Sequence, residues 1–228
     1  MPVLQQGARV PAEGAIASRA RAALGSLRVG ALAGKLLGFA LPLVAVLALS
    51  MWHNHARFGD AREFGHKLLT VGWHERITKW GLFSYHYLGR NLGILTSSLP
   101  FVNPTAPRVQ VNMHGLALWL TTPAYLWLLW PRRTGWLWWS LAATVALVAG
   151  MDLLYQNSGW QQFGYRFSND YAPMCFAMLA IGGFRLGPAF WAAGAWAVAI
   201  NAFGAATFNV DSRWYFNDAT QKTIFQPD

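Results

Sequence analysis

Charged residues are scarce in this sequence. Only 12% of its 228 residues are Asp, Glu, Lys or Arg, whereas 54% are hydrophobic. A soluble globular domain usually carries about twice that charged fraction. The shortage of charge therefore excludes an ordinary soluble domain and favours an integral membrane protein.

Cysteine is almost absent. Cys175 stands alone, which excludes an internal disulfide and a metal site built on cysteine. The six histidines fall between His53 and His114, and the "WHNH" stretch places two of them two residues apart, but no third ligand has a recognisable spacing. We interpret these histidines as occupants of a wet interface, and the sequence predicts neither a metal site nor a cofactor.

A dense run of Lys and Arg is also missing, although the net charge is +9. We interpret the scattered basic residues as topology signals and lipid head-group contacts, so no nucleic-acid partner is predicted. The sequence shows no internal repeat, and it has no nucleophile elbow, phosphate-binding glycine loop or zinc-peptidase helix. Few charges fall within its apolar segments, which argues against a transporter or channel.

Aromatic residues and long apolar segments, by contrast, are plentiful. The 13 Trp, seven Tyr and 14 Phe are typical of a chain that meets membrane–water interfaces. A helix needs about 20 mostly apolar residues to cross a bilayer. Candidate segments of this kind are residues 31–52, 113–130, 135–154, 171–184 and 186–208. The sequence thus predicts an all-α integral membrane fold with about five transmembrane helices, the last four of them forming a bundle over residues 113–208.

The arginines in the short connections predict the orientation. Arg132 and Arg133 follow the second candidate span, Arg185 follows the fourth, and residues 1–30 form a basic lead-in. With five spans these positions share one face, which the positive-inside rule makes cytoplasmic. The N-terminus is then cytoplasmic, whereas residues 53–112 and the tail over 209–228 are extracytoplasmic.

The long outer segment contains a second periodic pattern. From Trp73 to Leu95, apolar residues recur at spacings of three and four, and most charges fall between them. This pattern predicts an amphipathic helix with Gly81 and Gly89 as weak points. The helix would either lie in the membrane interface or pack on the protein's own spans.

Three stretches together resemble a known family. They are "WHNHARFGDAREFGHKL" from Trp52, "GLFSYHYLGRNL" from Gly81 followed by "GLALWLTTPAYLWLL" from Gly115, and "GWQQFGYRFSNDYAP" from Gly159. In this order they resemble the C-terminal half of bacterial membrane glycosyltransferases of the GT-C class, related to the protein O-mannosyltransferases. The resemblance runs from about Leu36 to about Gly183.

The resemblance implies transfer of a sugar from a polyprenyl-phosphate carrier at the outer surface of the bacterial cytoplasmic (inner) membrane. Family members are about twice as long, and their catalytic acid lies in an upstream loop, so the resemblance implies a half that is inactive alone. An upstream half-protein or an oligomer would be its partner, and a divalent metal would belong to the intact enzyme. The alternative is a non-catalytic membrane protein that binds a lipid-linked intermediate or a partner complex.

The candidate site residues lie in two of these stretches. Arg166 and Asp170 are four residues apart, so on an α-helix they could pair, and Asp152 ends a span at the same level. One interpretation is a structural salt bridge. The other makes Arg166 a contact for the lipid phosphate, with Tyr165 and Trp160 lining the acyl or sugar side. Further candidates for substrate or lipid-phosphate binding are Arg57 and Glu63, and no catalytic residue is assigned.

Overall fold

The structure is a computed structural model that describes residues 29–159 and 161–216. The lead-in up to residue 28, Trp160 and the end of the tail from residue 217 lie outside this description. The chain divides into two compact units, Met1–Leu69 and Thr70–Asp228. Each unit is described by itself.

The first unit is dominated by one long helix. Helix α2 (Val29–Phe58) contains the first candidate span and continues past its expected end at residue 52, up to Gly59, which has φ +74°. Residues 32–49 show exposed Leu, Val and Phe side chains around the helix. A helix that is apolar on all sides needs an apolar environment. A single 3₁₀ turn, η1 (His66–Leu68), follows.

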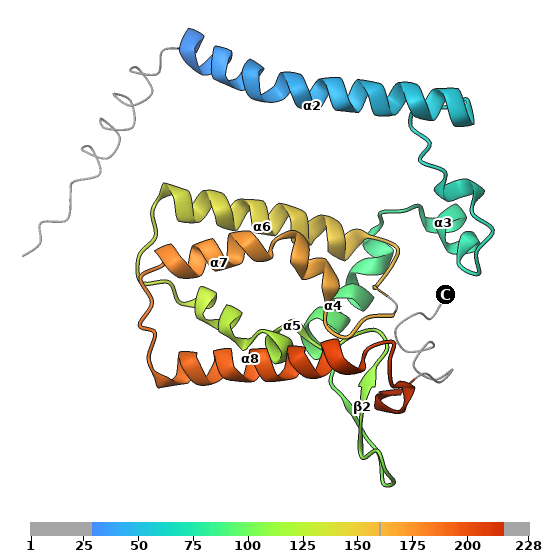
Figure 1. Ribbon diagram of the computed structural model, residues 1–228. Coiled ribbons are helices and arrows are strands. Elements are labelled where there is room, and N and C mark those ends of the chain that lie inside the picture. Colours follow the sequence, from blue (N-terminus) through green and yellow to red (C-terminus); the bar gives the residue numbers. More distant parts are fainter. Residues whose placement is uncertain (1–28, 160, 217–228) are drawn as a thin grey trace, which may run out of the picture. The chain divides into compact units, whose positions relative to one another are not determined.

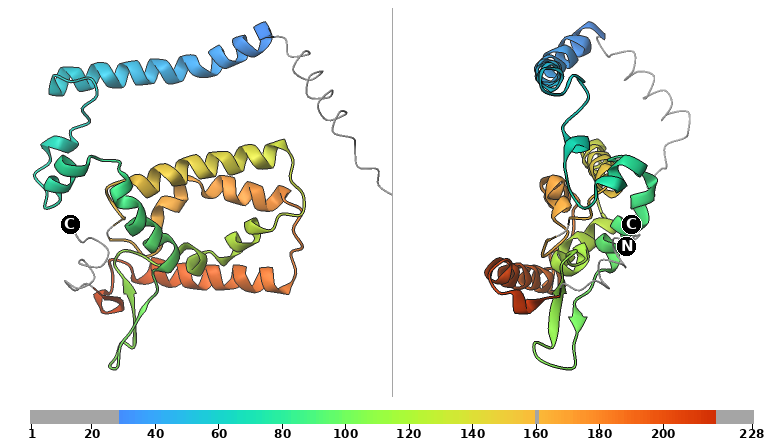
Figure 2. Two further views of the ribbon diagram at one scale, coloured as in Figure 1. Left: turned by 180° about the vertical axis from the view of Figure 1, so that it is seen from behind. Right: turned by 90° about the vertical axis from the view of Figure 1, so that its right-hand side faces the viewer.

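The second unit is mostly helical. Its helices are α3 (His74–Trp80), η2 (Tyr85–Tyr87), α4 (Leu88–Ser97), α5 (Leu118–Thr121), η3 (Pro123–Leu129), α6 (Trp136–Leu154), η4 (Arg166–Asp170), α7 (Ala172–Ile181), α8 (Pro188–Thr207) and η5 (Ser212–Trp214). The segment formed by α5 and η3 lies between α7 and α8, and α7 packs against α6 on its other side. The chain runs back and forth between the two ends of this layer (Figures 1 and 2).

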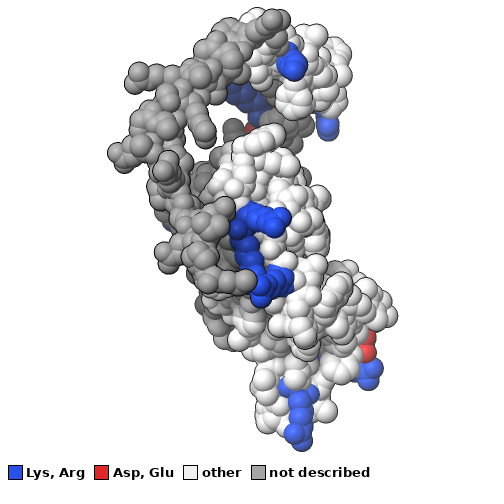
Figure 3. Space-filling model, turned by 90° about the vertical axis from the view of Figure 1, so that its left-hand side faces the viewer, with Lys and Arg blue, Asp and Glu red and all other residues white. Residues whose placement is uncertain are grey.

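The two ends of this helical layer differ in composition. At one end the short connections 130–135 and 182–187 carry Arg132, Arg133 and Arg185, and we call this the basic end. Figure 3 looks onto it and shows Lys and Arg gathered among uncharged surface. At the other end lie residues 155–171, helix α4 and the C-terminus of α8, and we call this the polar end.

Three helices are long and apolar enough to cross a membrane: Leu32–Phe58, Trp136–Leu154 and Pro188–Thr207. These helices indicate a membrane protein. They coincide in approximate position with the first, third and fifth candidate spans.

The other two candidate spans are not long helices, which corrects the sequence-based expectation. Residues 113–130 form α5 and η3, which meet at Thr122 (φ −140°, ψ 66°) because Pro123 disfavours a helical conformation in the residue before it. Helix α7 has ten residues and is about 15 Å long, half of a bilayer core. It ends where Gly182 and Gly183 follow, and Gly183 has φ +67°.

The amphipathic pattern over residues 73–95 also folds differently from the expectation. It is divided between α3, η2 and α4, and the division falls at Gly81, where φ is +79°. Gly81 was one of the two expected weak points, whereas Gly89 lies inside α4. The apolar side chains point inward only in part: Ile77, Tyr87 and Ile94 are buried, but Trp73 and Trp80 are more than a third exposed.

A small sheet, absent from the expected all-α fold, completes the polar end. Strands β1 (Phe101–Val102) and β2 (Val109–Asn112) pair antiparallel, and β3 (Tyr215–Phe216) adds to β2 in parallel. Val111 and Tyr215 of the sheet form a buried core with Met113 and Leu116. Partly buried aromatic and apolar residues pack against this core: Leu120, Phe163, Phe203, Phe208 and Trp214. This core joins the sheet to α8 and to the segment after residue 160.

Candidate functional site: a polar cavity at one end of the helical layer

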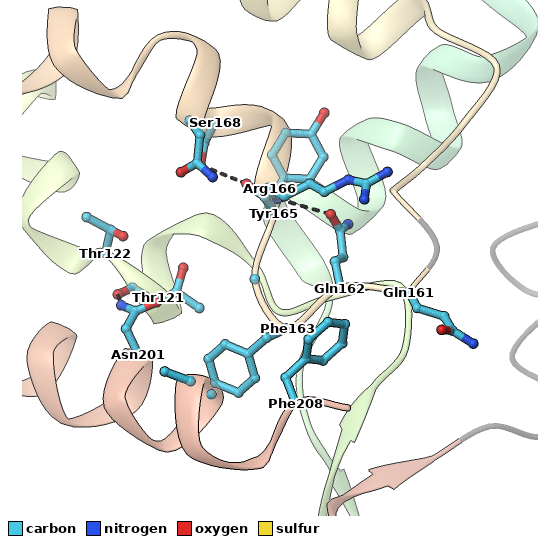
Figure 4. Close-up of a pocket in the computed structure, with 14 residues that line it drawn as sticks. Thr121, Thr122, Gln161, Gln162, Phe163, Tyr165, Arg166, Ser168, Asn201 and Phe208 are labelled. Atoms are coloured by element: carbon cyan, nitrogen blue, oxygen red, sulfur yellow. Dashed lines mark hydrogen bonds between the residues drawn. The ribbon is translucent and has the colours of Figure 1, made fainter. Parts of the chain in front are cut away.

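A cavity of about 430 Å³ opens at the polar end. Its walls come from three parts of the chain: the junction of α5 and η3, the segment 161–169, and the last two turns of α8. Thr121 and Asn201 face the 161–168 segment across it (Figure 4). Hydroxyl, amide and aromatic groups line it, together with the charged residue Arg166.

The α8 wall is fixed by hydrogen bonds to the broken helix. Asn201 donates from Nδ2 to the Thr121 carbonyl at 2.9 Å and to the Ala197 carbonyl at 2.8 Å. Trp196 donates from Nε1 to the Leu120 carbonyl at 2.7 Å. The break before Pro123 leaves carbonyls without helical partners, and α8 supplies the donors.

The opposite wall is organised by Gln162, whose side chain is 2% exposed. Its Nε2 donates to the carbonyls of His114 and Ser158 at 2.5 and 3.0 Å, and its Oε1 accepts from the Arg166 backbone N–H at 3.0 Å. Gly115 and Gly159, both at φ +93°, leave the space that Gln162 fills, because a Cβ at either position would collide with it. Gln162 thereby sets the backbone position of Arg166.

A buried polar network supports this wall. Its members are Ser98, Asn112, His114, Ser158 and Gln162, and all are less than 3% exposed. Asn112 accepts from the His114 backbone N–H at 2.8 Å and donates to Ser98 Oγ at 3.2 Å, and His114 Nδ1 lies 3.0 Å from Ser158 Oγ. Burial, with Arg90 and Arg76 nearby, lowers the pKa of His114 from 6.5 to about 4. The ring is therefore neutral at physiological pH.

A second set of contacts closes the C-terminal end of α6. Asn91 donates from Nδ2 to the Leu153 and Tyr155 carbonyls at 3.0 and 2.8 Å, and Arg90 donates from Nη2 to the Gln156 carbonyl at 2.6 Å. The last carbonyls of a helix lack helical donors, and a cation there is favourable. The "GLFSYHYLGRNL" stretch thus docks α4 onto the segment that leads to the cavity.

Two carboxyl groups near this segment, those of Asp152 and Asp170, are not among the described residues that line the cavity. The charges of Asp152 and Asp170 interact. Tyr165 is 3% exposed, and burial together with the nearby Asp152 raises the pKa of its hydroxyl. Asp152 Oδ2 and the Tyr165 hydroxyl are buried without a hydrogen-bond partner among the described residues. The fold therefore brings Asp152, Tyr165 and Asp170 close together.

The expected pairing of Arg166 with Asp170 does not form within the described part of the chain. Residues 166–170 are a 3₁₀ helix, in which residues three apart share a face and residues four apart diverge. The Arg166 guanidinium lies 5.5 Å from the centroid of the Phe167 ring, and its side chain is exposed. The salt-bridge interpretation is therefore wrong, which leaves a cation at the edge of the cavity.

The remaining candidates lie elsewhere. Arg57 and Glu63 belong to the first unit, where the Arg57 guanidinium lies 4.9 Å from the centroid of the Phe58 ring and Glu63 accepts from the Gly65 backbone N–H at 2.8 Å. Trp160 is outside the described residues. Among the residues that the structure describes, no group of three or more His, Cys, Asp and Glu side chains is placed to hold a metal ion.

Sequence reasoning missed four residues that build the cavity: Thr121, Thr122, Gln162 and His114. Two signals pointed to the first three of them, and none pointed to His114. The Thr-Thr-Pro triplet interrupts an apolar segment, and the two glutamines of "GWQQFGYRF" precede the arginine directly.

Comparison with protein-family models, with curated proteins and with solved structures gives no match to this chain. The resemblance noted from the sequence therefore remains an expectation, and the function is inferred from the site itself.

Proposed function

We propose that this chain is a multi-pass membrane protein that binds the phosphate and sugar of a polyprenyl-phosphate-linked saccharide in the cavity at its polar end. The observation that carries the proposal is the presence of Arg166, whose side chain is exposed, among the residues that line a cavity of about 430 Å³ together with amide and hydroxyl groups. In this role the chain serves as the carrier-lipid part of a glycosyltransferase-like system.

The chemistry of the lining supports a charged saccharide ligand. A guanidinium presents a planar fork of donors that matches two phosphate oxygens. Thr122, Gln161 and Asn169 offer hydroxyl and amide groups that can exchange hydrogen bonds with sugar hydroxyls. Phe163 and Phe208 add apolar ring surface on the α8 side of the cavity (Figure 4).

We propose that the chain crosses the bacterial cytoplasmic membrane five times. The segment formed by α5 and η3 (residues 118–129) and the helix α7 run between the same two ends as α6 and α8, so they would cross within the layer as a broken helix and a short helix. Irregular backbone is tolerated at membrane depth where protein buries it. The basic end is then cytoplasmic, the polar end faces outward, and α3 and α4 lie at the outer interface.

One observation favours binding without transfer as a second function. Among the described residues, those that line the cavity include a cation but no carboxylate, so none of them carries a side chain suited to activate an acceptor hydroxyl as a general base. On this alternative the chain holds a lipid-linked intermediate for another protein.

The test is binding of polyprenyl phosphate to the full-length chain in nanodiscs, compared with uncharged polyprenol of the same length. We expect tighter binding of the phosphate, and about tenfold weaker binding for Arg166→Gln. Arg108→Gln removes an equally exposed arginine outside the cavity and should leave binding unchanged. Equal binding of phosphate and alcohol, or an Arg166→Gln variant with unchanged affinity, would overturn the proposal. Release of sugar from a labelled polyprenyl-phosphate donor then separates transfer from binding alone.

A further inference from the structure

Two cavities at the basic end share Arg132. One, of about 430 Å³, is lined by Leu126, Trp127, Trp130, Arg132, Phe184 and Arg185. The other, of about 630 Å³, is lined by Arg132 with Arg133, Thr134 and Trp138 among others. Both lie at the opposite end of the layer from the polar cavity.

The connections that carry these arginines are held together by the backbone. The N–H groups of Arg132 and Arg133 both donate to the Gly182 carbonyl at 3.0 Å. Gly183 lies so close to the aliphatic part of Arg133 that a Cβ there would come within 2.8 Å of Arg133 Cγ. The 130–135 and 182–187 connections therefore form one surface, on which the positions of the arginines are fixed relative to each other.

This surface offers hydrogen-bond donors with no acidic partner. Neither connection contains Asp or Glu. Within the described residues, the side chains of Arg132, Arg133 and Arg185 make no ion pair or hydrogen bond. Trp138 is 6% exposed, and its indole N–H has no hydrogen-bond partner in the part of the chain that the structure describes. Donors that line the same cavity without an acceptor among the described residues indicate an anionic ligand.

The rest of the lining is apolar, which determines the kind of anion. Trp127 and Phe184 line the first cavity beside the two arginines. Trp130 and Trp136 are 73% and 80% exposed, as expected of rings at a membrane–water interface. A free phosphate would use the guanidinium groups but not the rings, whereas a phospholipid would use both.

We infer that the basic end binds an anionic phospholipid. Its phosphate lies between Arg132 and Arg185, with Arg133 and the Trp138 indole N–H as further donors on the adjoining cavity. Its acyl chain lies along Trp127, Trp130 and Phe184. Basic pockets between membrane helices bind lipid head groups by the same combination of charge and apolar surface. This site is independent of the proposed saccharide site, because it lies at the other end of the layer and uses different residues.

The experiment is a native mass spectrometry titration of the purified full-length chain with phosphatidylglycerol, and with phosphatidylcholine of the same acyl chains. We expect the unaltered chain to bind phosphatidylglycerol more tightly than phosphatidylcholine. Compared with the unaltered chain, Arg132→Gln or Arg185→Gln should bind phosphatidylglycerol about fivefold more weakly, and the double variant about twentyfold to thirtyfold more weakly. Arg62→Gln/Arg108→Gln is the matched control, since it removes two exposed arginines that line neither cavity. Its affinity for phosphatidylglycerol should equal that of the unaltered chain.

Further measurements separate the sources of the anion. Trp138→Phe keeps an aromatic ring and removes the N–H, and should weaken phosphatidylglycerol binding several-fold. Millimolar glycerol 3-phosphate should not displace the lipid. The inference is overturned if phosphatidylcholine binds equally well, if glycerol 3-phosphate competes fully, or if the double variant binds like its matched control. Arg132→Lys/Arg185→Lys, which keeps the charge, should bind better than the double Gln variant.

Discussion

The two ends of the helical layer hold their polar groups in opposite ways. At the polar end the long segments bury Gln162 and His114. The Gln162 side chain bonds to the protein's own backbone, and the His114 ring bonds to the Ser158 hydroxyl. At the basic end the connections are short, and Arg132 and Arg185 remain exposed. A buried polar group must be satisfied inside the protein, so it fixes a conformation, whereas an exposed cation is available to a ligand. Stability should therefore depend on the polar end and lipid binding on the basic end.

The largest expected effect comes from Gln162→Ala at the polar end. The substitution removes three hydrogen bonds from a buried site and leaves the carbonyls of His114 and Ser158 short of a donor. We expect the free energy of unfolding to fall by about 3 kcal/mol, measured by thermal unfolding in a neutral detergent. The neighbouring Gln161→Ala changes an exposed side chain and should stay within about 0.5 kcal/mol. Equal losses for the two variants would show that the network does not fix the segment.

Acid should weaken the same end through His114. The unfolded chain takes up a proton near pH 6.5, whereas the folded protein does so only near pH 4. The contribution of the neutral His114 ring to the free energy of unfolding is therefore fully present above pH 6.5 and is lost as the pH falls from 6.5 towards 4. Between pH 7.5 and 5 we expect a decrease of about 2 kcal/mol in the free energy of unfolding.

The control for this pH dependence is a pair of histidine variants. His114→Gln should be less stable at pH 7.5 and should lose most of the decrease between pH 7.5 and 5. His55→Gln alters an exposed side chain on α2 and should show the same decrease in stability between pH 7.5 and 5 as the unaltered chain. A His114→Gln variant whose stability falls with acid as steeply as that of the unaltered chain would assign the effect to other groups.

The smallest expected effect is that of Arg132→Gln/Arg185→Gln on stability. Both side chains are exposed and make no hydrogen bond within the described residues, so the free energy of unfolding in detergent without anionic lipid should change by less than about 0.5 kcal/mol. With phosphatidylglycerol added, the unaltered chain should gain more stability than the variant, because a ligand that binds the folded state raises its stability. A large loss in plain detergent would mean that the arginines also stabilise the fold.

The sequence predicted the parts of the fold that depend on local pattern. Long apolar segments became α6 and α8 near their expected bounds, since a helix that crosses a bilayer must be apolar over its whole length. Gly81 ended a helix as expected. The predictions of a second and a fourth long helix were wrong because hydropathy does not register how a Pro or a pair of glycines interrupts a helix. The sequence did not predict the short sheet, because β2 and β3 lie about a hundred residues apart in the chain.

Of the candidate site, the sequence indicated the segment but not its geometry. It identified Arg166, Tyr165 and Asp170 as unusual residues beside an apolar segment, and it assumed an α-helical spacing for them. In the 3₁₀ helix that forms instead, Tyr165 is buried near Asp152, and Arg166 lies at the edge of the cavity.

The sequence by itself determined that this chain carries long apolar helices, that Arg132, Arg133 and Arg185 lie in short connections, and that a polar, aromatic segment follows α6. These properties depend on residues close together in the chain. Only the tertiary structure decided that Gln162 meets His114, that Asn201 meets Thr121, and that Arg132 shares a surface with Arg185. Each of these contacts joins segments roughly 50 to 80 residues apart, and such contacts depend on how whole helices pack, which no local pattern encodes.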